Sequence, residues 1–415
     1  EQLDYLRSTK DFDEDFLAYL ENFRFSGDIY ALEEGTVVFP GEPLMIVKAP
    51  IIEAQLMESA LLNIVNFQTL IATKASRVAY VAQPGQVSEF GLRRAQAPDA
   101  AVYGARAALI GGCSSTSNVL AAQMCDTFAT GTHAHSWIMA FDSELEAFRA
   151  YAEIYPDSCL LLVDTYYTLR GVKNAITVFK EMRAKGLKPK GIRLDSGDLA
   201  YLSKKAREML DEAGFEDAMI FASGDLDEYT IQSLKLQGAR IDCYGVGTKL
   251  ITSHSNPSLG GVYKICEVEE NGVMTPKMKI SDNPAKVTNP GEKRIFRLVS
   301  KNNNKAIADV ICLADEKIDE SKPYTLIHPE YRWKTKEVRN FRAKELYRQI
   351  YKDGKLVYDL PDLKTIQRRK RESFDEFWDE YKRLEKPHIY KVDLSEKLYN
   401  LKQKLIDELV GKKGK

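Results

Sequence analysis

The segment GTHAHSW, residues 131–137, places two of the chain's five histidines, His133 and His135, only two positions apart. An imidazole can donate or accept a proton near neutral pH, or bind a metal ion. In a strand both side chains would point to the same face, whereas in a turn they could diverge. Either one could also be a hydrogen-bonded histidine of purely structural use. A metal pair is a weaker interpretation, because no third histidine lies in this stretch.

Three aspartates follow His135 at intervals that match one strand–helix unit each. Asp164 lies in LLVDTYYTL, Asp195 in RLDSGD and Asp225 in ASGD, and the successive spacings from His135 are 29, 31 and 30 residues. In a β/α barrel the carboxyl ends of the parallel strands converge on one mouth. The spacing therefore predicts that these four residues share one site.

The motif RLDSGD has both a functional and a structural interpretation. Arg193 can form two parallel hydrogen bonds to a carboxylate or a phosphate, and a helix start attracts anions. Ser196 and Asp198 could act only as helix caps, but capping does not explain Arg193 and Asp195 at a strand end. Asp164 remains open, because a carboxylate there can orient an imidazole or cap the next helix.

Glycine-bearing loops follow the last two predicted strands. Gly224 lies in SGD, and GVGT contains Gly245, Gly247 and Thr248. Glycine lets the backbone approach a ligand closely, and in barrels the last two strand–helix loops often hold a phosphate. The alternative is an ordinary glycine turn.

The elements that would position these residues form a repeating pattern from about residue 105. Short apolar runs without alternation, typical of strands buried on both faces, are followed by amphipathic helices. Three of these helices close with a glycine that can serve as a cap, namely Gly186, Gly214 and Gly238. The strand-like runs span residues 158–166, 191–198, 218–225 and 240–250. The alternation predicts a parallel sheet, and closing that sheet into a β/α barrel would bring the polar strand ends together.

The regions outside this repeat have a different character. Residues 36–50 indicate short strands, and Pro50 can start a long helix over residues 51–77. After residue 255, Asn271-Gly272 is typical of a hairpin turn, and residues 294–314 indicate a second hairpin. From about residue 334 the chain is charged and of helical composition, which predicts a helical C-terminal extension.

The predicted organisation is thus α/β, a β/α unit with an appended β-rich domain and a helical extension. We expect the N-terminal mixed region to pack against the hairpins. The predicted boundaries are 1–105 for the N-terminal α+β region, 106–255 for the barrel with the site, 256–330 for the hairpins and 331–415 for the extension.

Composition narrows the class of protein. The chain has 59 basic and 60 acidic residues, whereas a nucleic-acid binder usually has a basic excess. No run of about 18 apolar residues indicates a membrane span, and the polar, acidic start does not look like a signal peptide. Six dispersed cysteines, with no CxxC pair, favour a reducing, cytoplasmic setting and give no zinc-ligand spacing. We therefore expect neither nucleic acid nor a membrane as a partner.

Several motifs taken together resemble the nicotinate phosphoribosyltransferase family, along nearly the whole chain and in the family's order. They are FGLRRAQ, GGCSSTSNV, GTHAHSW, VDTYYTL, RLDSGD, YGVGTKL and DNPAKVTNPGEK. The resemblance implies an irregular β/α barrel with an appended β-rich domain, working as a homodimer. It also implies an enzyme that transfers phosphoribosyl from phosphoribosyl pyrophosphate to nicotinate, giving nicotinate mononucleotide and pyrophosphate. This would be the first step of NAD salvage from nicotinate, with ATP and Mg²⁺ as cofactors.

The resemblance also implies a role for each motif residue. His135 would be the phosphohistidine that couples ATP hydrolysis, oriented by Asp164, and His133 would be a supporting, family-variable position. Nicotinate would be held by Thr132, Arg193, Phe90 and Arg93. Phosphoribosyl pyrophosphate would be held by Asp195, Ser196, Gly224, Asp225, Gly245, Gly247 and Thr248.

Two departures from the family leave alternatives open. Family members carry a preceding TDLYxLTM-like segment whose tyrosine reaches the partner subunit's site, and the given sequence starts after it. Tyr167 also replaces the second aspartate of the family's VDTYDTL. The alternatives are a nicotinamide phosphoribosyltransferase and a non-catalytic paralogue that acts as a binding subunit. The presence of His135, Arg193 and Thr248 favours an enzyme over the paralogue.

Overall fold

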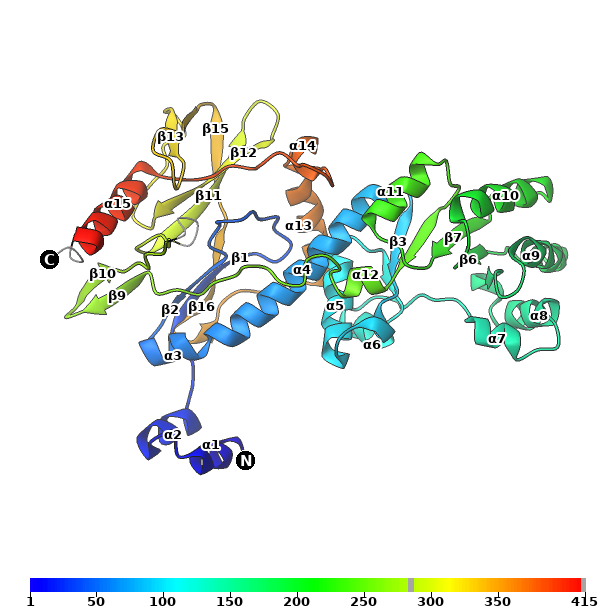
Figure 1. Ribbon diagram of the computed structural model, residues 1–415, viewed down its shortest axis with the longest axis horizontal. Helices are drawn as coiled ribbons and strands as arrows, with labels where there is room; N and C mark the ends of the chain where they lie inside the picture. Colours follow the sequence, from blue (N-terminus) through cyan, green and yellow to red (C-terminus); the bar gives the residue numbers. More distant parts are fainter. Residues whose placement is uncertain (283–286, 412–415) are drawn as a thin grey trace.

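The computed structural model describes residues 1–282 and 287–411. The protein is elongated, with a parallel-sheet lobe and a β-rich lobe connected by the long helix α4 (Glu58–Ala82) (Figure 1). A pair of short helices at the N-terminus, α1 (Gln2–Thr9) and α2 (Glu14–Glu21), projects away from both lobes (Figure 1). Of the motif DNPAKVTNPGEK, residues 283–286 lie outside the described residues.

The parallel-sheet lobe contains six strands in the order β4-β3-β8-β7-β6-β5. The strands are β3 (Gln86–Glu89), β4 (Ser115–Thr116), β5 (Leu160–Leu162), β6 (Gly191–Leu194), β7 (Met219–Ser223) and β8 (Cys243–Val246). Helices α5 (Pro98–Gly111), α9 (Thr168–Ala184), α10 (Leu199–Glu212) and α11 (Glu228–Leu236) belong to the same lobe. All residues of β5 and β8 are buried, as the apolar runs predicted. The predicted caps Gly186, Gly214 and Gly238 follow α9, α10 and α11 with positive φ.

Strand β3 lies inside this sheet, between β4 and β8, although sequence analysis assigned no strand to it. Its sequence, QVSE, has only one large apolar residue, Val87, so it lacks the run that marked the other strands. Because β3 and α5 belong to the parallel-sheet lobe and α4 packs on α5, the predicted boundary at residue 105 is wrong.

The backbone pairing describes an open sheet. β4 and β5 lie at opposite edges, and no strand pairing among the described residues joins them. One isolated bridge, between Thr116 and Ala129, extends the β4 edge. The parallel α/β sheet is therefore confirmed, whereas barrel closure is not seen in these pairings.

The β-rich lobe is built from two larger sheets and a hairpin. One sheet has the order β14-β13-β18-β12-β11-β15 and the other β17-β16-β1-β2, while β9 pairs with β10. The bounds are β1 (Asp28–Leu32), β2 (Met45–Lys48), β9 (Glu267–Glu270), β10 (Val273–Pro276), β11 (Lys293–Ser300), β12 (Ala306–Leu313), β13 (Tyr324–Ile327), β14 (Thr335–Val338), β15 (Phe341–Glu345), β16 (Tyr347–Lys352), β17 (Lys355–Leu356) and β18 (Val392–Leu394). Both predicted hairpins, β9–β10 around Asn271-Gly272 and β11–β12, are confirmed.

The C-terminal region is not the helical extension that its composition predicted. It contains the five strands β14 to β18 as well as α13 (Leu363–Asp375), α14 (Asp379–Lys382) and α15 (Glu396–Gly411). In β15, FRAKE, charged residues occupy the exposed positions, so the apolar period of two is weak in sequence. The N-terminal strand β1 forms its backbone pairs with β16 of the C-terminal region and with β2. Tyr30 and Ile46 also pack against Ile295 of β11, so the N-terminal region contacts the predicted hairpin as well.

The helices of the N-terminal half deviate in one further detail. The single helix predicted after Pro50 is divided at Met57 into α3 (Ile51–Leu56) and α4.

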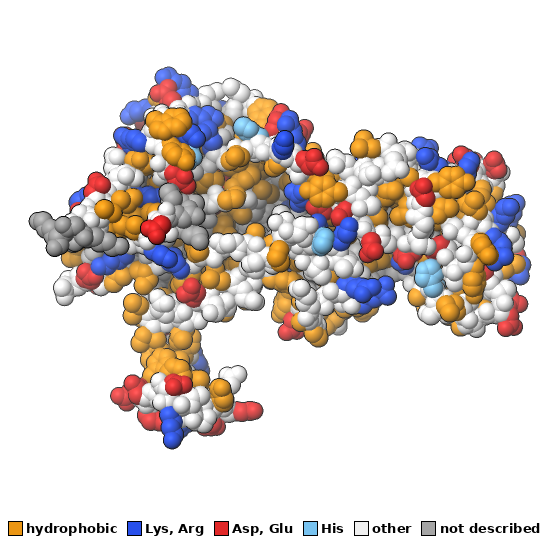
Figure 2. Space-filling view, in the orientation of Figure 1, with side chains coloured by type: hydrophobic (Ala, Val, Ile, Leu, Met, Phe, Trp, Pro, Cys, Tyr) orange, Lys and Arg blue, Asp and Glu red, His pale blue; other side chains and the backbone are white. Residues whose placement is uncertain are grey.

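Among the described residues, no helix combines the length and apolarity needed to cross a bilayer. Positive and negative side chains are interspersed on the visible face, as the near-zero net charge predicts (Figure 2).

A buried ion pair holds the β-rich lobe together. Arg297 on β11 and Asp309 on β12 are both inaccessible to solvent, with 2.8 Å between Nη2 and Oδ2. Asp309 also accepts a hydrogen bond of 2.8 Å from the hydroxyl of Tyr390, and Arg297 donates one of 2.8 Å to the carbonyl of Val37. The pair therefore connects the N-terminal segment, the central hairpin and the C-terminal segment.

Replacing Asp309 with Ala should strongly destabilise the protein, because Arg297 would lose its buried counter-ion and keep only the weaker contact of 3.3 Å with the partly exposed Glu376. We expect the free energy of unfolding, measured by urea denaturation, to fall by about 3–5 kcal/mol. The double variant R297M/D309L removes both charges and should be much closer to wild type. A D309A variant as stable as wild type would show that the pair has no such role.

Candidate active site

Arg193, on β6, is the centre of a hydrogen-bond network at the carboxyl ends of the parallel strands. Its Nε donates to Ser223 Oγ, its Nη1 to Thr132 Oγ1 and its Nη2 to Asp195 Oδ1, each at 2.8 Å. Only 16% of the side chain is exposed. The guanidinium is thus held in three directions by residues from three different segments.

Asp195 is the first residue after β6 and bridges two charged or chargeable groups. Its Oδ1 accepts hydrogen bonds from Arg193 and from the Ser223 hydroxyl, and its Oδ2 lies 3.8 Å from His135 Nε2. Burial opposes ionisation of this carboxyl, but the bond from Ser223 and the Arg193 charge hold its pKa below the ordinary value. Asp195 is therefore an anion at neutral pH.

His135 is the first residue of the short helix α7 (His135–Met139). Its Nδ1 lies 3.1 Å from Thr165 Oγ1, and the side chain is 41% exposed. The contact with Thr165 fixes one ring nitrogen and leaves Nε2 facing Asp195. Sequence analysis did not select Thr165 or Ser223, although each lies beside a predicted aspartate or glycine in VDTYY or SGD.

The predicted contact between Asp164 and His135 is not found. Its Oδ2 accepts hydrogen bonds from the Asp195 backbone N–H at 3.1 Å and from the Ser196 hydroxyl at 2.6 Å. No hydrogen bond links Asp164 to His135 in the part of the chain that the structure describes. Asp164 does not cap α9 either, since the residue before that helix is Tyr167. Because β5 and β6 are parallel neighbours, the loop after β6 is within its reach, and Asp164 orders that loop.

His133 has different partners from His135 and is buried, whereas His135 is partly exposed. It is 7% exposed, and its Nε2 accepts a hydrogen bond of 3.1 Å from the Leu162 backbone N–H. Its ring meets the edge of Tyr151 at 4.7 Å, and burial lowers its pKa to about 4. Within residues 1–282 and 287–411 no three His, Cys, Asp or Glu side chains are placed to hold a metal ion. His133 is thus the structural histidine of the two.

The glycine loops approach the network closely. A Cβ on Gly224, whose φ is +99°, would lie 2.1 Å from the Asp195 carbonyl oxygen. A Cβ on Gly245 would lie 2.7 Å from the Phe221 ring and 2.8 Å from the Phe90 ring. Side chains are therefore excluded at both positions.

The remaining predicted residues lie at the same edge of the sheet. Gly247 directly precedes α12 (Thr248–Ile251), and Thr248 and Asp225 are exposed. Asp198 caps α10 by accepting from the Tyr201 N–H, so its structural interpretation is confirmed, whereas Ser196 bonds to Asp164.

Phe90 and Arg93 lie on the segment after β3. The Phe90 ring stacks on Phe221 with centroids 5.5 Å apart, and the Arg193 guanidinium lies 5.4 Å from the Phe90 centroid. Arg93, in the turn Leu92–Arg94, is exposed and makes no hydrogen bond or ion pair with any described residue. Phe90 therefore belongs to the network, and Arg93 is a free cation beside it.

Two hollows lie away from the network. A hollow of about 500 Å³ lies beside α1, and one of about 250 Å³ lies beside Arg183 and Phe215. Neither hollow is lined by a residue of the network.

Family models match most of the chain. The model of the nicotinate phosphoribosyltransferase (NAPRTase) family matches residues 85–322. The models of the NAPRTase N-terminal domain and the nicotinate phosphoribosyltransferase C-terminal domain match residues 1–66 and 292–402.

Individual proteins are similar in sequence and structure. A nicotinate phosphoribosyltransferase of Bacillus subtilis is 51% identical over 408 residues, covering 98% of this chain and 83% of its own. One from Dictyostelium discoideum is 35% identical and covers 94% of this chain and 75% of its own. The crystal structure of human nicotinic acid phosphoribosyltransferase superposes with a TM-score of 0.85 at 29% identity, covering 97% of this chain and 88% of that one.

The depressed pKa of His133 predicts a pH-dependent loss of stability. Unfolded His133 binds a proton below about pH 6.5, whereas folded His133 does so only near pH 4, so stability falls as the pH drops between these values. We expect wild type to lose up to about 3 kcal/mol relative to H133Q, whose amide oxygen can still accept from Leu162 but does not titrate. Urea denaturation between pH 7 and pH 4 measures the difference. Parallel pH profiles for the two proteins would contradict the expectation.

Proposed function

We propose, since the chain belongs to the nicotinate phosphoribosyltransferase family, that it transfers phosphoribosyl from phosphoribosyl pyrophosphate to the ring nitrogen of nicotinate. The products are nicotinate mononucleotide and pyrophosphate, and the reaction is the first step of NAD salvage from nicotinate. The observation that carries the proposal within the site is the anchored guanidinium of Arg193 at the ends of the parallel strands.

Nicotinate binds through its carboxylate and its ring. Three of the five N–H groups of Arg193 are occupied by protein, which leaves others for a substrate anion. Phe90, whose ring lies beside the guanidinium, supplies an apolar surface for the pyridine ring, and Thr132 borders it. Arg93 adds a free positive charge near the same segment.

Phosphoribosyl transfer needs positioning and charge stabilisation. The bond from the anomeric carbon to the pyrophosphate oxygen breaks as a bond to the pyridine nitrogen forms, and positive charge develops on the ribose. The anionic Asp195 can stabilise that charge, because it is held in place by Arg193 and Ser223. Ser196, Gly224, Gly245, Gly247 and Thr248 surround the phosphates in this proposal. Gly224 and Thr248 are exposed and open to an anion, whereas the Ser196 hydroxyl is bonded to Asp164 and Gly245 is buried in β8, where it keeps the strand end free of a side chain.

Asp195, through Oδ2, and the exposed Asp225 would offer Mg²⁺ carboxylate oxygens, the donor type that this ion prefers alongside substrate phosphates. When bound, it neutralises charge on the leaving pyrophosphate. ATP is the second cofactor. Because Thr165 occupies Nδ1 of His135, Nε2 is the nitrogen that would accept a phosphoryl group from bound ATP, with ADP as the leaving group.

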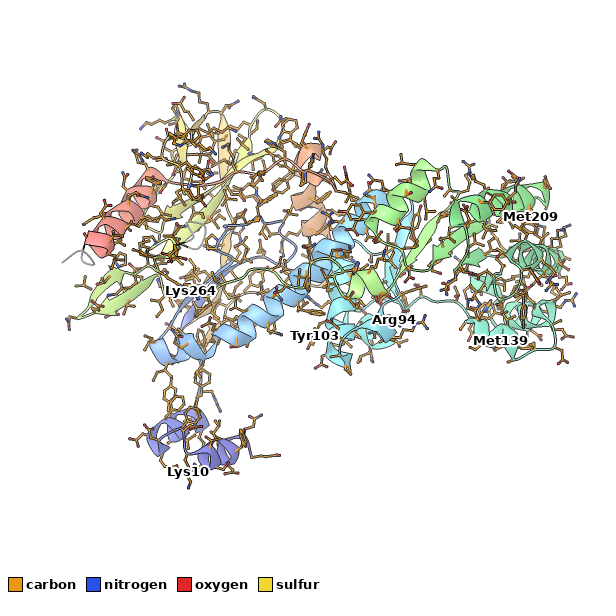
Figure 3. All side chains as sticks on the ribbon, viewed as in Figure 1. Lys10, Arg94, Tyr103, Met139, Met209 and Lys264 are labelled. Carbon is orange, nitrogen blue, oxygen red and sulfur yellow. The ribbon has the colours of Figure 1, made fainter. Side chains whose placement is uncertain are left out.

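We also propose that the enzyme is a cytoplasmic homodimer. Apolar side chains are exposed around the segment that leads to His135, with Phe128 88%, Val119 71% and Met139 68% exposed. Figure 3 shows Tyr103 and Met139 along one edge of the parallel-sheet lobe, together with Arg94. A second copy covering this surface removes it from water.

All six cysteines are free thiols, which supports a reducing compartment.

The proposed activity is tested by measuring nicotinate mononucleotide formation with and without ATP. Wild type should turn over and be stimulated by ATP. His135→Ala should lose the stimulation and retain some transfer, because the histidine carries phosphate and does not attack the ribose. His388→Ala, which changes an exposed histidine in the other lobe, is the matched control. Turnover with nicotinamide alone would favour the nicotinamide enzyme, and no turnover would favour a non-catalytic paralogue.

Replacing Arg193 with Lys should weaken nicotinate binding. Lysine keeps the charge but loses the planar fork, and a charged hydrogen bond is worth about 1.5–3 kcal/mol. We expect the KM for nicotinate to rise about ten- to a hundredfold, with little change for phosphoribosyl pyrophosphate. Arg207→Lys is the control, because Arg207 is similarly bonded, to Asp211, Phe215 and Ala218, away from the site. A rise confined to the phosphoribosyl pyrophosphate KM would assign Arg193 to a phosphate.

A further inference from the structure

Glu89, the last residue of β3, is a fully buried carboxyl next to the proposed nicotinate site. None of its surface is exposed, and no ion pair with any described Lys, Arg or His neutralises it. Neither the chemistry of phosphoribosyl transfer nor the packing of β3 requires a carboxyl at this position.

Both oxygens of Glu89 are used as hydrogen-bond acceptors. Oε1 accepts from the backbone N–H of Gly91, and Oε2 accepts from the Thr116 hydroxyl at 2.6 Å. Glu89 therefore joins the turn after β3 to strand β4. A Cβ on Gly91 would lie 2.7 Å from Glu89 Oε1, so the fit between carboxyl and turn is close.

The first of these bonds fixes the segment that carries Phe90. The Phe90 N–H donates to the Val246 carbonyl at 2.9 Å, and Glu89 binds the next N–H along the chain, that of Gly91. Phe90 is thus held on both sides while its ring contacts Phe221 and Arg193.

The second bond leads to the segment that carries Thr132. The Thr116 carbonyl accepts from the Thr130 N–H at 2.9 Å, and Thr132, two residues later, accepts from Arg193. One buried carboxyl is therefore connected to both segments that border the guanidinium.

We propose that Glu89 is a positioning residue that sets the shape of the nicotinate pocket by holding the Phe90 turn and the Thr116 strand together. This inference rests on the proposed function for its substrate, but the ordering of the turn is independent of it. Glu89 acts on binding, because it does not contact the reacting atoms. Its loss should thus raise the KM for nicotinate and leave kcat nearly unchanged.

Three variants test the proposal in steady-state kinetics and in hydrogen exchange of residues 90–96. Glu89→Ala leaves the buried Gly91 N–H without an acceptor, so the KM for nicotinate should rise about tenfold, with that for phosphoribosyl pyrophosphate within about twofold. Glu89→Gln keeps an acceptor for Gly91 and should recover most of the loss. Glu53→Ala is the control: Glu53 is also buried and accepts from the N–H and hydroxyl of Ser26, but it lies on α3, far from the site (Figure 1).

Exchange in residues 90–96 should quicken in E89A and stay unchanged in E53A, whether or not the protein turns over. Inactive wild type with this exchange pattern would refute the proposed substrate and support the ordering role. Equal exchange in E89A and wild type, or a loss confined to kcat, would overturn the inference. If E89A does not fold, Thr116→Val decides: a raised nicotinate KM supports the role, and an unchanged one refutes it.

Discussion

The candidate site depends on a permanent positive charge that is mostly buried. Arg193 cannot lose its proton, and a buried guanidinium requires partners for its N–H groups. Ser223, Thr132 and Asp195 meet that requirement from three segments, so the position of each is linked to the others. Asp195 in turn faces His135, and its backbone N–H is bound by Asp164. The hydrogen-bond partners that the buried guanidinium of Arg193 requires thus fix the arrangement of side chains at this edge of the sheet.

The β-rich lobe also contains a buried guanidinium, that of Arg297, and neutralises it differently. Arg297 and Asp309 are completely buried, and further hydrogen bonds link Asp309 to Tyr390 and Arg297 to Val37, Ser373 and Glu376. Here the ion pair connects distant parts of the chain and is closed to solvent, whereas the Arg193 network keeps His135 partly exposed. Full enclosure is consistent with a structural pair, and partial exposure with a site that admits a ligand.

Sequence patterns predicted the parts of the fold that are determined locally. Four buried strands had apolar runs, three helices ended at glycine, and Asn271-Gly272 marked its hairpin. Strand β3 escaped detection because QVSE depends on its neighbours in the sheet for its conformation, and β15 because its charged residues obscure the alternation. The predicted site residues do gather at one edge. Their pairing was less predictable, because Thr165, and not Asp164, is the side chain that reaches His135.

The placement of β3 has a consequence for the order in which the protein can be assembled. β3 ends at residue 89 and pairs with β8, which begins at residue 243, so the two sides of the Phe90 segment are far apart in the chain. Contacts between such distant segments form slowly, because a long loop must first be closed. A ribosome must therefore release most of the parallel-sheet lobe before Phe90 meets Gly245, and a nascent chain has no pocket until then. Once the lobe is complete, any ligand that binds this edge stabilises the junction between its first and last strands.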